Sequence, residues 1–159
     1  MSLSPSPPHE AYAKIAGVFA GGLAAAGALA HVLGREPREH DALDFFVLGA
    51  ATFKAARTLA RDEVTSFLRD PFVQGVAHEG GEKPLGTGDM RQAIGELVTC
   101  SRCIGTWAAA GLSAAQILAP RFGRLLTWSR AAAAANDWLQ AGFALAAAKA
   151  NEVEARSRD

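Results

Sequence analysis

The chain has 159 residues, half of them hydrophobic, and its 16 Lys and Arg residues balance 16 Asp and Glu residues. A chain of this length forms one domain, and balanced charge with no long block of one sign argues against a nucleic-acid-binding protein. Two cysteines are too few for the disulfide framework of a small secreted protein.

The first long apolar segment is residues 15–33, IAGVFAGGLAAAGALAHVL, which carries no formal charge. It follows an arm, residues 1–12, that is predicted to be flexible. Because about 20 apolar residues in a helix cross a bilayer core, the segment is predicted to be a transmembrane helix. Small residues on one face allow close contact with another helix: Ala13, Gly17, Gly21 and Ala25.

Two alternatives exist for this segment: a buried helix of a soluble, alanine-rich bundle, and a signal peptide. The segment lacks the charged stripe that a solvated helix face requires. The residues before it include one Lys, one Glu and several prolines, instead of a short basic region. A retained membrane helix is therefore the preferred interpretation.

Three further apolar segments contain charged side chains, and none would be assigned to a membrane by hydropathy alone. They cover residues 43–60, 94–119 and 125–148. Together with the first segment they predict an all-α fold, a four-helix transmembrane bundle over residues 13–150, followed by a polar tail, residues 151–159.

The longest connection contains the glycine-rich stretch GVAHEGGEKPLGTGD, residues 75–89, which predicts a mobile loop. Lys and Arg are more numerous in the arm, this loop and the tail than in the two opposite turns, so all three are predicted to be cytoplasmic. His78 and Glu79 in the loop are interpreted as solvated side chains. Asp89, with Gln92 three residues later, predicts the N-cap of the third helix.

The cysteines, Cys100 and Cys103, have CxxC spacing inside the third apolar segment. A redox pair normally has its first thiol at a helix N-terminus. An unbroken helix would place Cys100 about three turns beyond its cap, so the pair is predicted to be reduced and to carry no turnover; a break near Thr99 would reverse this. Zinc needs four ligands, and the four histidines are scattered singly. Packing is the third alternative.

Two stretches, ATFKAARTLARDEVTSFLRDPF (51–72) and GELVTCSRCIGTW (95–107), resemble a small bacterial membrane family, domain of unknown function thirteen-sixty. One branch of that family is labelled a sporulation protein. The residues that match are Arg57 and Arg61 in an arginine-rich helix end, Asp62, Val64, Thr65, Leu68, Arg69 and Pro71 in a first motif, and Glu96, Leu97, Thr99, Cys100, Cys103, Gly105 and Trp107 in a second.

The family usually has proline after the first cysteine, where this chain has Ser101, and this departure favours an unbroken helix. The resemblance implies a protein of the bacterial inner membrane; the four segments predict a multi-pass protein, and the Lys and Arg count predicts that both termini are cytoplasmic. The resemblance implies no reaction.

Charges inside the apolar segments predict polar contacts within the membrane. Lys54, Arg57 and Arg61 share one arc of the second segment. Since intramembrane charges tend to pair, Lys54 or Arg57 is predicted to bind Asp137 or Glu96.

The sequence contains no catalytic constellation, so the predicted function is a non-enzymatic structural or partner-binding component of a membrane. Its expected partners are the lipid bilayer and a second copy of the chain or another membrane protein, with no nucleic acid. The alternative is a membrane thiol oxidoreductase or a zinc-binding protein that uses the cysteine pair. The candidate site residues are Arg57, Arg61, Asp62, Thr65, Arg69, Glu96, Cys100, Cys103, Trp107 and Asp137.

Overall fold

The computed structural model describes residues 7–36, 39, 41–75 and 81–156. The described residues form six α-helices, which confirms the all-α prediction. The helices are α1 His9–Val32, α2 Ala42–Arg61, α3 Ser66–Arg69, α4 Met90–Thr99, α5 Ser101–Leu118 and α6 Pro120–Arg156. Two short 3-10 turns, η1 Glu63–Thr65 and η2 Asp70–Phe72, flank α3, and strand β1 Val73–Gln74 pairs antiparallel with β2 Lys83–Pro84.

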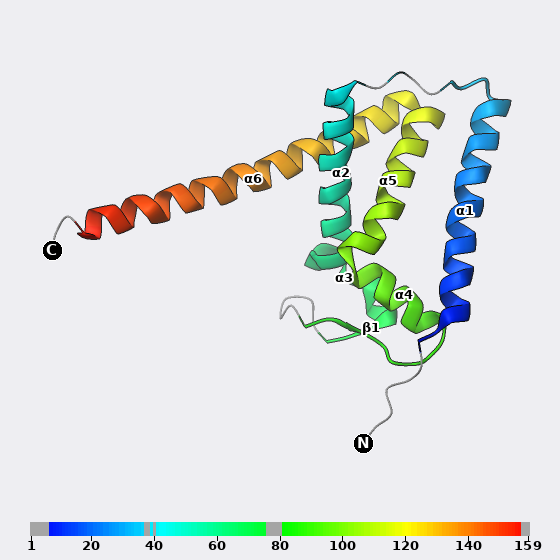
Figure 1. The fold of residues 1–159 in the computed structure, drawn as a ribbon, viewed down its shortest axis with the longest axis horizontal. Coiled ribbons are helices and arrows are strands. Elements are labelled where there is room, and N and C mark those ends of the chain that lie inside the picture. Colours follow the sequence, from blue (N-terminus) through cyan, green and yellow to red (C-terminus); the bar gives the residue numbers. More distant parts are fainter. Residues whose placement is uncertain (1–6, 37–38, 40, 76–80, 157–159) are drawn as a thin grey trace.

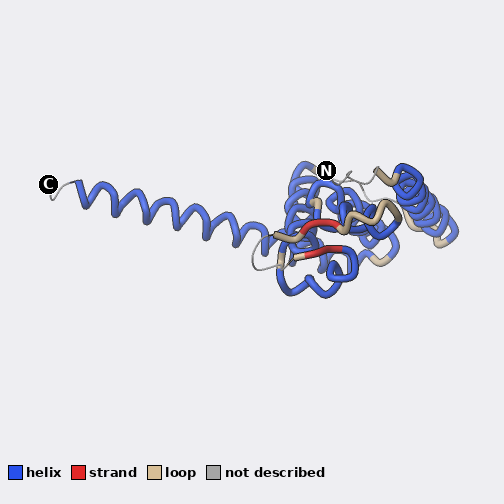
Figure 2. The backbone as a smooth tube through the Cα atoms, turned by 90° about the horizontal axis from the view of Figure 1, so that it is seen from below, coloured by secondary structure: helices blue, strands red, loops and turns tan. Residues whose placement is uncertain are grey.

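Three helices, α1, α2 and α5, stand side by side as a bundle (Figure 1). The short elements α3, α4 and the β1–β2 hairpin gather at one end of this bundle, next to the start of α1. The last helix, α6, starts at the opposite end, crosses α2 and projects far beyond the bundle (Figures 1 and 2). The apolar segments therefore give three bundle helices and one long oblique helix.

Local sequence explains where these helices begin and end. Gly34, with φ +61°, follows α1, and the backbone N–H groups of Gly34 and Arg35 return to the oxygens of His31 and Ala30, a Schellman cap. The predicted N-cap of the third apolar segment is confirmed, because Asp89 Oδ1 accepts from the Arg91 N–H at 2.8 Å.

The corner between α5 and α6 depends on one glycine. A Cβ atom on Gly123 would lie 2.4 Å from the backbone nitrogen of Gln116. The Gln116 side chain donates to Thr127 Oγ1 at 2.9 Å, and Thr127 is 1% exposed. Pro120 begins α6, at the one helical position where a missing N–H costs nothing.

The core lies where α2, α5 and α6 meet and consists of small or medium side chains, including Ala51, Leu112 and Ala131. Large apolar side chains lie mostly on the outside. Phe45 and Phe46 of α2 are 72% and 71% exposed. The bundle thus presents an apolar outer surface.

Among the described residues, α1 is the one helix long and apolar enough to cross a membrane, and almost none of its apolar stretch is buried. This helix supports membrane association. The four-helix transmembrane bundle is not supported by hydropathy, because the other long helices carry too many polar side chains.

Candidate functional site

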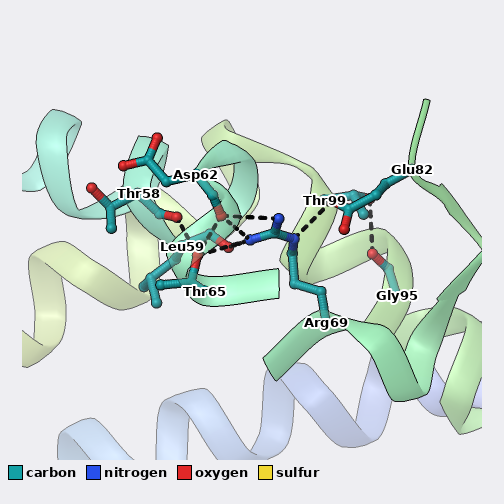
Figure 3. A network of polar contacts seen from close by, with 8 residues as sticks. All are labelled: Thr58, Leu59, Asp62, Thr65, Arg69, Glu82, Gly95 and Thr99. Atoms are coloured by element: carbon teal, nitrogen blue, oxygen red, sulfur yellow. Dashed lines mark hydrogen bonds and ion pairs between the residues drawn. The ribbon is translucent and has the colours of Figure 1, made fainter. Parts of the chain in front are cut away.

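Arg69 of the first motif is buried, 1% exposed, and ties the end of α2 to the segment that follows (Figure 3). Its Nη1 donates to the backbone oxygens of Leu59 (2.8 Å) and Asp62 (3.1 Å) and to Thr65 Oγ1 (2.8 Å). Nη2 also donates to the Asp62 oxygen at 3.1 Å, and Nε donates to Glu82 Oε2 at 2.8 Å.

These contacts satisfy the last carbonyl groups of α2, which have no partner within the helix. The positive guanidinium also lies at the negative end of the helix dipole. Thr65 Oγ1 lies 2.6 Å from the backbone oxygen of Thr58 and 3.0 Å from that of Asp62. Asp62, Thr65 and Arg69 of the first motif therefore build a helix end. Arg57 and Arg61 are exposed on α2 beside it.

The second motif contains a helix break. α4 ends at Thr99, Cys100 is extended (φ −98°, ψ 103°), and α5 begins at Ser101. The prediction of one continuous third helix is therefore wrong. Thr99 Oγ1 donates to the Gly95 oxygen at 2.8 Å, and Cys100 Sγ accepts from the Cys103 N–H at 3.3 Å. Cys100 caps α5 through its sulfur, so the break forms without a proline.

Cys100 is consequently the N-cap of α5, where free backbone N–H groups favour a thiolate. The side chain of Cys103 donates a hydrogen bond to Cys100, and this lowers the pKa of Cys100; the backbone N–H groups of Cys103 and Arg102 act in the same direction. Both cysteines are free thiols, Cys100 half-buried and Cys103 exposed. The expectation of a poorly activated pair rested on the unbroken helix, and the break at Cys100 removes that basis.

Gly95 connects the two motifs. A Cβ atom there would lie 2.4 Å from the backbone oxygen of Phe72 and 3.2 Å from Pro84 Cβ, so α4 can lie against η2 and β2 only with glycine at this position. At Gly105 an added Cβ would make an ordinary contact of 3.6 Å with Ala56 Cβ. The helix end built by Arg69 therefore packs together with the junction of α4 and α5 at Cys100, which we call the cysteine corner.

A cavity of about 360 Å³ lies between α1 and the corner of α4 and α5. Its walls include Glu96, Cys103 and Trp107 from the second motif, and Tyr12 and Phe19 from α1. The rings of Phe19 and Trp107 pack edge to face, with centroids 5.0 Å apart. The second motif thus supplies one side of this cavity and α1 the other.

Both oxygens of the Glu96 carboxylate accept hydrogen bonds. The Tyr12 hydroxyl donates to Oε2, and Gln92 Nε2 donates to Oε1 at 2.9 Å. Gln92 Oε1 in turn accepts from the Gly88 N–H at 2.9 Å. This chain of contacts ties α1 to α4 and fixes the position of the carboxylate.

Lys54 and Asp137 form an ion pair, Nζ to Oδ2 at 2.8 Å, with side chains 19% and 37% exposed. The predicted pairing of Lys54 with Asp137 is confirmed. Glu96, the alternative acid in that prediction, binds Tyr12 and Gln92.

In the described part of the chain, no group of three or more His, Cys, Asp and Glu side chains could hold a metal ion. The zinc alternative at Cys100 and Cys103 therefore gains no third ligand there. His78 and Glu79 lie outside the described residues.

Sequence reasoning missed Tyr12 and Glu82, and it assigned Gln92 only a capping role. Tyr12 is the one tyrosine in the chain and stands where the arm meets an apolar helix, which was a usable signal. Gln92 and Glu96 have the i, i+4 spacing at which helical side chains meet. Glu82 lies in a glycine-rich connection, where no periodicity marks a partner for Arg69.

The sequence pattern of a family described as "Protein of unknown function (DUF1360)" matches residues 47–143, more than half of the chain. The chain belongs to this family. Both motifs and Asp137 lie within the matched DUF1360 region, whereas Tyr12 and the rest of α1 precede it. No curated protein and no solved structure matched the chain.

Proposed function

We propose that this protein is a multi-pass membrane protein in which α1, α2 and α5 cross the bilayer together. The observation that carries the proposal is the position of α1, the most apolar helix, alongside α5. The Phe19–Trp107 contact holds α1 against α5, and the Tyr12–Glu96 contact holds α1 against α4 next to it. A bilayer around α1 would therefore also surround α5 and the α2 helix packed on it.

The lengths of the three helices support this arrangement. They contain 24, 20 and 18 residues, which correspond to about 36, 30 and 27 Å at about 1.5 Å per residue. The hydrocarbon core of a bilayer is about 30 Å thick. The exposed rings of Phe45 and Phe46 would then face lipid, and the charge of Lys54 is already paired.

The proposed orientation follows from the distribution of Lys and Arg between the ends of the bundle. The end with α4 carries more of them among the described residues: Lys14, Arg57, Arg61, Arg69, Lys83, Arg91 and Arg102, against Arg35, Arg121 and Arg124 at the other end. We therefore place the α4 end, the N-terminus and the cysteines in the cytoplasm of a bacterium. The C-terminus is also proposed to be cytoplasmic, from the charge count of the tail, which requires α6 to return obliquely through the bilayer as a fourth crossing.

Single-cysteine labelling in intact cells tests this topology. In a variant with Cys100 and Cys103 replaced by alanine, Glu36→Cys should react with an impermeant maleimide from outside. Lys83→Cys should react only after the cells are permeabilised. Labelling of Lys83→Cys in intact cells would contradict the orientation, and recovery of the protein in the soluble fraction would contradict the membrane placement.

We propose that the membrane protein acts as a non-enzymatic, partner-binding component, and that α6 carries the contact. Beyond Asp137, α6 projects away from the bundle (Figure 2), and Leu139, Phe143 and Leu145 are 73%, 77% and 74% exposed. Such a surface needs cover by a second copy of the chain or by another membrane protein. Light scattering of the purified protein in detergent should give the mass of a dimer, and Phe143→Ser should lower the measured mass toward that of a monomer. A monomeric wild-type protein would exclude a second copy of the chain as the partner.

A second function, thiol–disulfide exchange, is favoured by one specific observation: Cys100 caps α5 and has a lowered pKa. Equilibration of the full chain with glutathione buffers should give one reversible intramolecular disulfide, which either Cys100→Ser or Cys103→Ser abolishes. If no such disulfide forms, the pair serves packing alone.

A further inference from the structure

The cavity between α1 and the α4–α5 corner contains three titratable groups, one from each helix that faces it. They are the hydroxyl of Tyr12, the carboxylate of Glu96 and the thiol of Cys103. Arg102, next to Cys103 in the chain, is exposed, and Cys100 caps the helix in which Cys103 lies. Glu96 and Cys103 line the same cavity from the two sides of the corner where α4 meets α5.

We propose that Glu96 accepts the proton of Cys103 when the cysteine pair closes to a disulfide, and that the cavity receives an apolar disulfide substrate. This proposal rests on the thiol–disulfide exchange proposed above. The walls suit such a substrate, because Phe19 and Trp107 offer aromatic surface beside the thiol.

The reaction is balanced as two exchanges. The Cys100 thiolate attacks one sulfur of the substrate disulfide; the substrate S–S bond breaks, a Cys100–substrate disulfide forms, and the first substrate thiolate leaves and takes a proton. Cys103 then gives its proton to Glu96 and attacks Cys100 Sγ. The mixed disulfide breaks, the Cys100–Cys103 disulfide forms, and the second substrate thiolate leaves with the proton from Glu96. The dithiol loses two electrons and the substrate disulfide gains them.

Glu96 is suited to this role because its position is fixed while some of its lone pairs stay available. A carboxylate offers about four acceptor positions, and Tyr12 and Gln92 each occupy one. Because Cys100 is already favoured as a thiolate, a base is needed for Cys103 and not for Cys100.

The two exchanges can be timed separately with 4,4′-dithiodipyridine, a neutral aromatic disulfide whose released thione absorbs light. The reduced full chain in detergent should release one equivalent of thione as Cys100 reacts and a second as Cys103 closes the pair. In Glu96→Gln the first phase should match the wild type, and the second should slow by about 100-fold near neutral pH, the usual scale of general base catalysis. Glu96→Asp should recover part of that rate.

Glu10→Gln is the matched control, because it removes an exposed carboxylate of α1 that does not line the cavity. Its second phase should match the wild-type rate. Tyr12→Phe breaks the contact between α1 and α4 but keeps the Glu96 carboxylate, and a loss in this variant as large as that of Glu96→Gln would assign the effect to the position of α1 and overturn the proposal. Equal second-phase rates and pH profiles in wild type and Glu96→Gln would overturn the role of Glu96 alone. A wild-type chain that releases only one equivalent would overturn the exchange function itself.

Discussion

A buried guanidinium stabilises a fold only when its donors meet acceptors, since desolvation of the charge is costly. Arg69 meets this condition through all three of its nitrogens, with Glu82 on one side and the end of α2 on the other. A lysine carries its donors on a single ammonium nitrogen and could not bind acceptors on both sides, as the planar guanidinium group does. The arginine is therefore specific to this helix end.

Replacing Arg69 by methionine should destabilise the protein by about 3–5 kcal/mol, the usual loss when one partner of a buried ion pair is removed. The change leaves Glu82, whose side chain is 9% exposed, without its cation. Thermal unfolding in detergent, followed by circular dichroism, measures the effect. Arg61→Met is the control: because Arg61 is exposed, this variant should unfold at the same temperature as the wild type. Equal stability of the two variants would contradict the stabilising role of Arg69.

Cys100 should react with iodoacetamide faster than an ordinary thiol at neutral pH. Its pKa is lowered chiefly by the hydrogen bond from Cys103, so the reactive thiolate is already populated below the free value of about 8.5. The midpoint of the alkylation rate against pH should lie below that value in the wild type and rise toward it in Cys103→Ala. A wild-type midpoint at or above the free value would refute the assignment.

At the scale of elements, the short helix α4 is held by a glycine contact and not by large apolar side chains. Its buried residues are Gln92, Ala93 and Gly95. Because Gly95 meets the backbone of Phe72, α4 cannot shift away without opening both the hairpin contact and the cavity wall. The position of the cysteine corner therefore depends on the close contact between Gly95 and the backbone of Phe72.

Gly95→Ala should therefore destabilise the protein by about 1–3 kcal/mol, as overpacking does. Gly49→Ala in the middle of α2 is the matched control, since an added Cβ there meets nothing within 4 Å. Alanine favours a helix over glycine by about 1 kcal/mol, so this variant should be as stable as the wild type or more so. Chemical unfolding of both variants separates the two effects, and a Gly95 variant as stable as Gly49→Ala would disprove the close packing.

The sequence predicts most of the elements but not the break within the third. The apolar segments identify α1, α2 and most of α6, which extends beyond residues 125–148 at both ends. The charges of Lys54 and Asp137 mark them as candidates for a pair, with Arg57 and Glu96 as the alternatives. The break at Cys100 was missed because a sulfur cap leaves no pattern in the sequence and Ser101 is compatible with a continuous helix. The Tyr12–Glu96 and Arg69–Glu82 contacts depend on how distant segments pack, which local propensity does not contain.

At the scale of the whole molecule, α6 is the element that departs most from a compact bundle. It runs for 37 residues, and only its first part packs on α2 and α5. The ion pair of Lys54 with Asp137 joins α2 to α6 shortly after Ala134, the last buried residue of α6. It therefore ties α6 to the bundle near the start of the projecting part.

A double-mutant cycle tests this contact. Asp137→Ala should cost more stability than Asp137→Ala combined with Lys54→Ala, because the single change leaves Lys54 unpaired, and the coupling should be about 1 kcal/mol. The pair Lys149–Glu152, with side chains 66% and 44% exposed, is the control, and its coupling should be about 0–0.5 kcal/mol. Strictly additive losses at Lys54 and Asp137 would show that the pair does not hold α6.

The place of Tyr12 gives this molecule a built-in spectroscopic reporter. It is the one tyrosine in the chain, and its hydroxyl bonds the carboxylate that joins α1 to α4. Biosynthetic incorporation of 3-fluorotyrosine would therefore place a single fluorine nucleus at the contact between α1 and α4, without any substitution in the chain. A change in that fluorine resonance would report a change in the contact between these two helices.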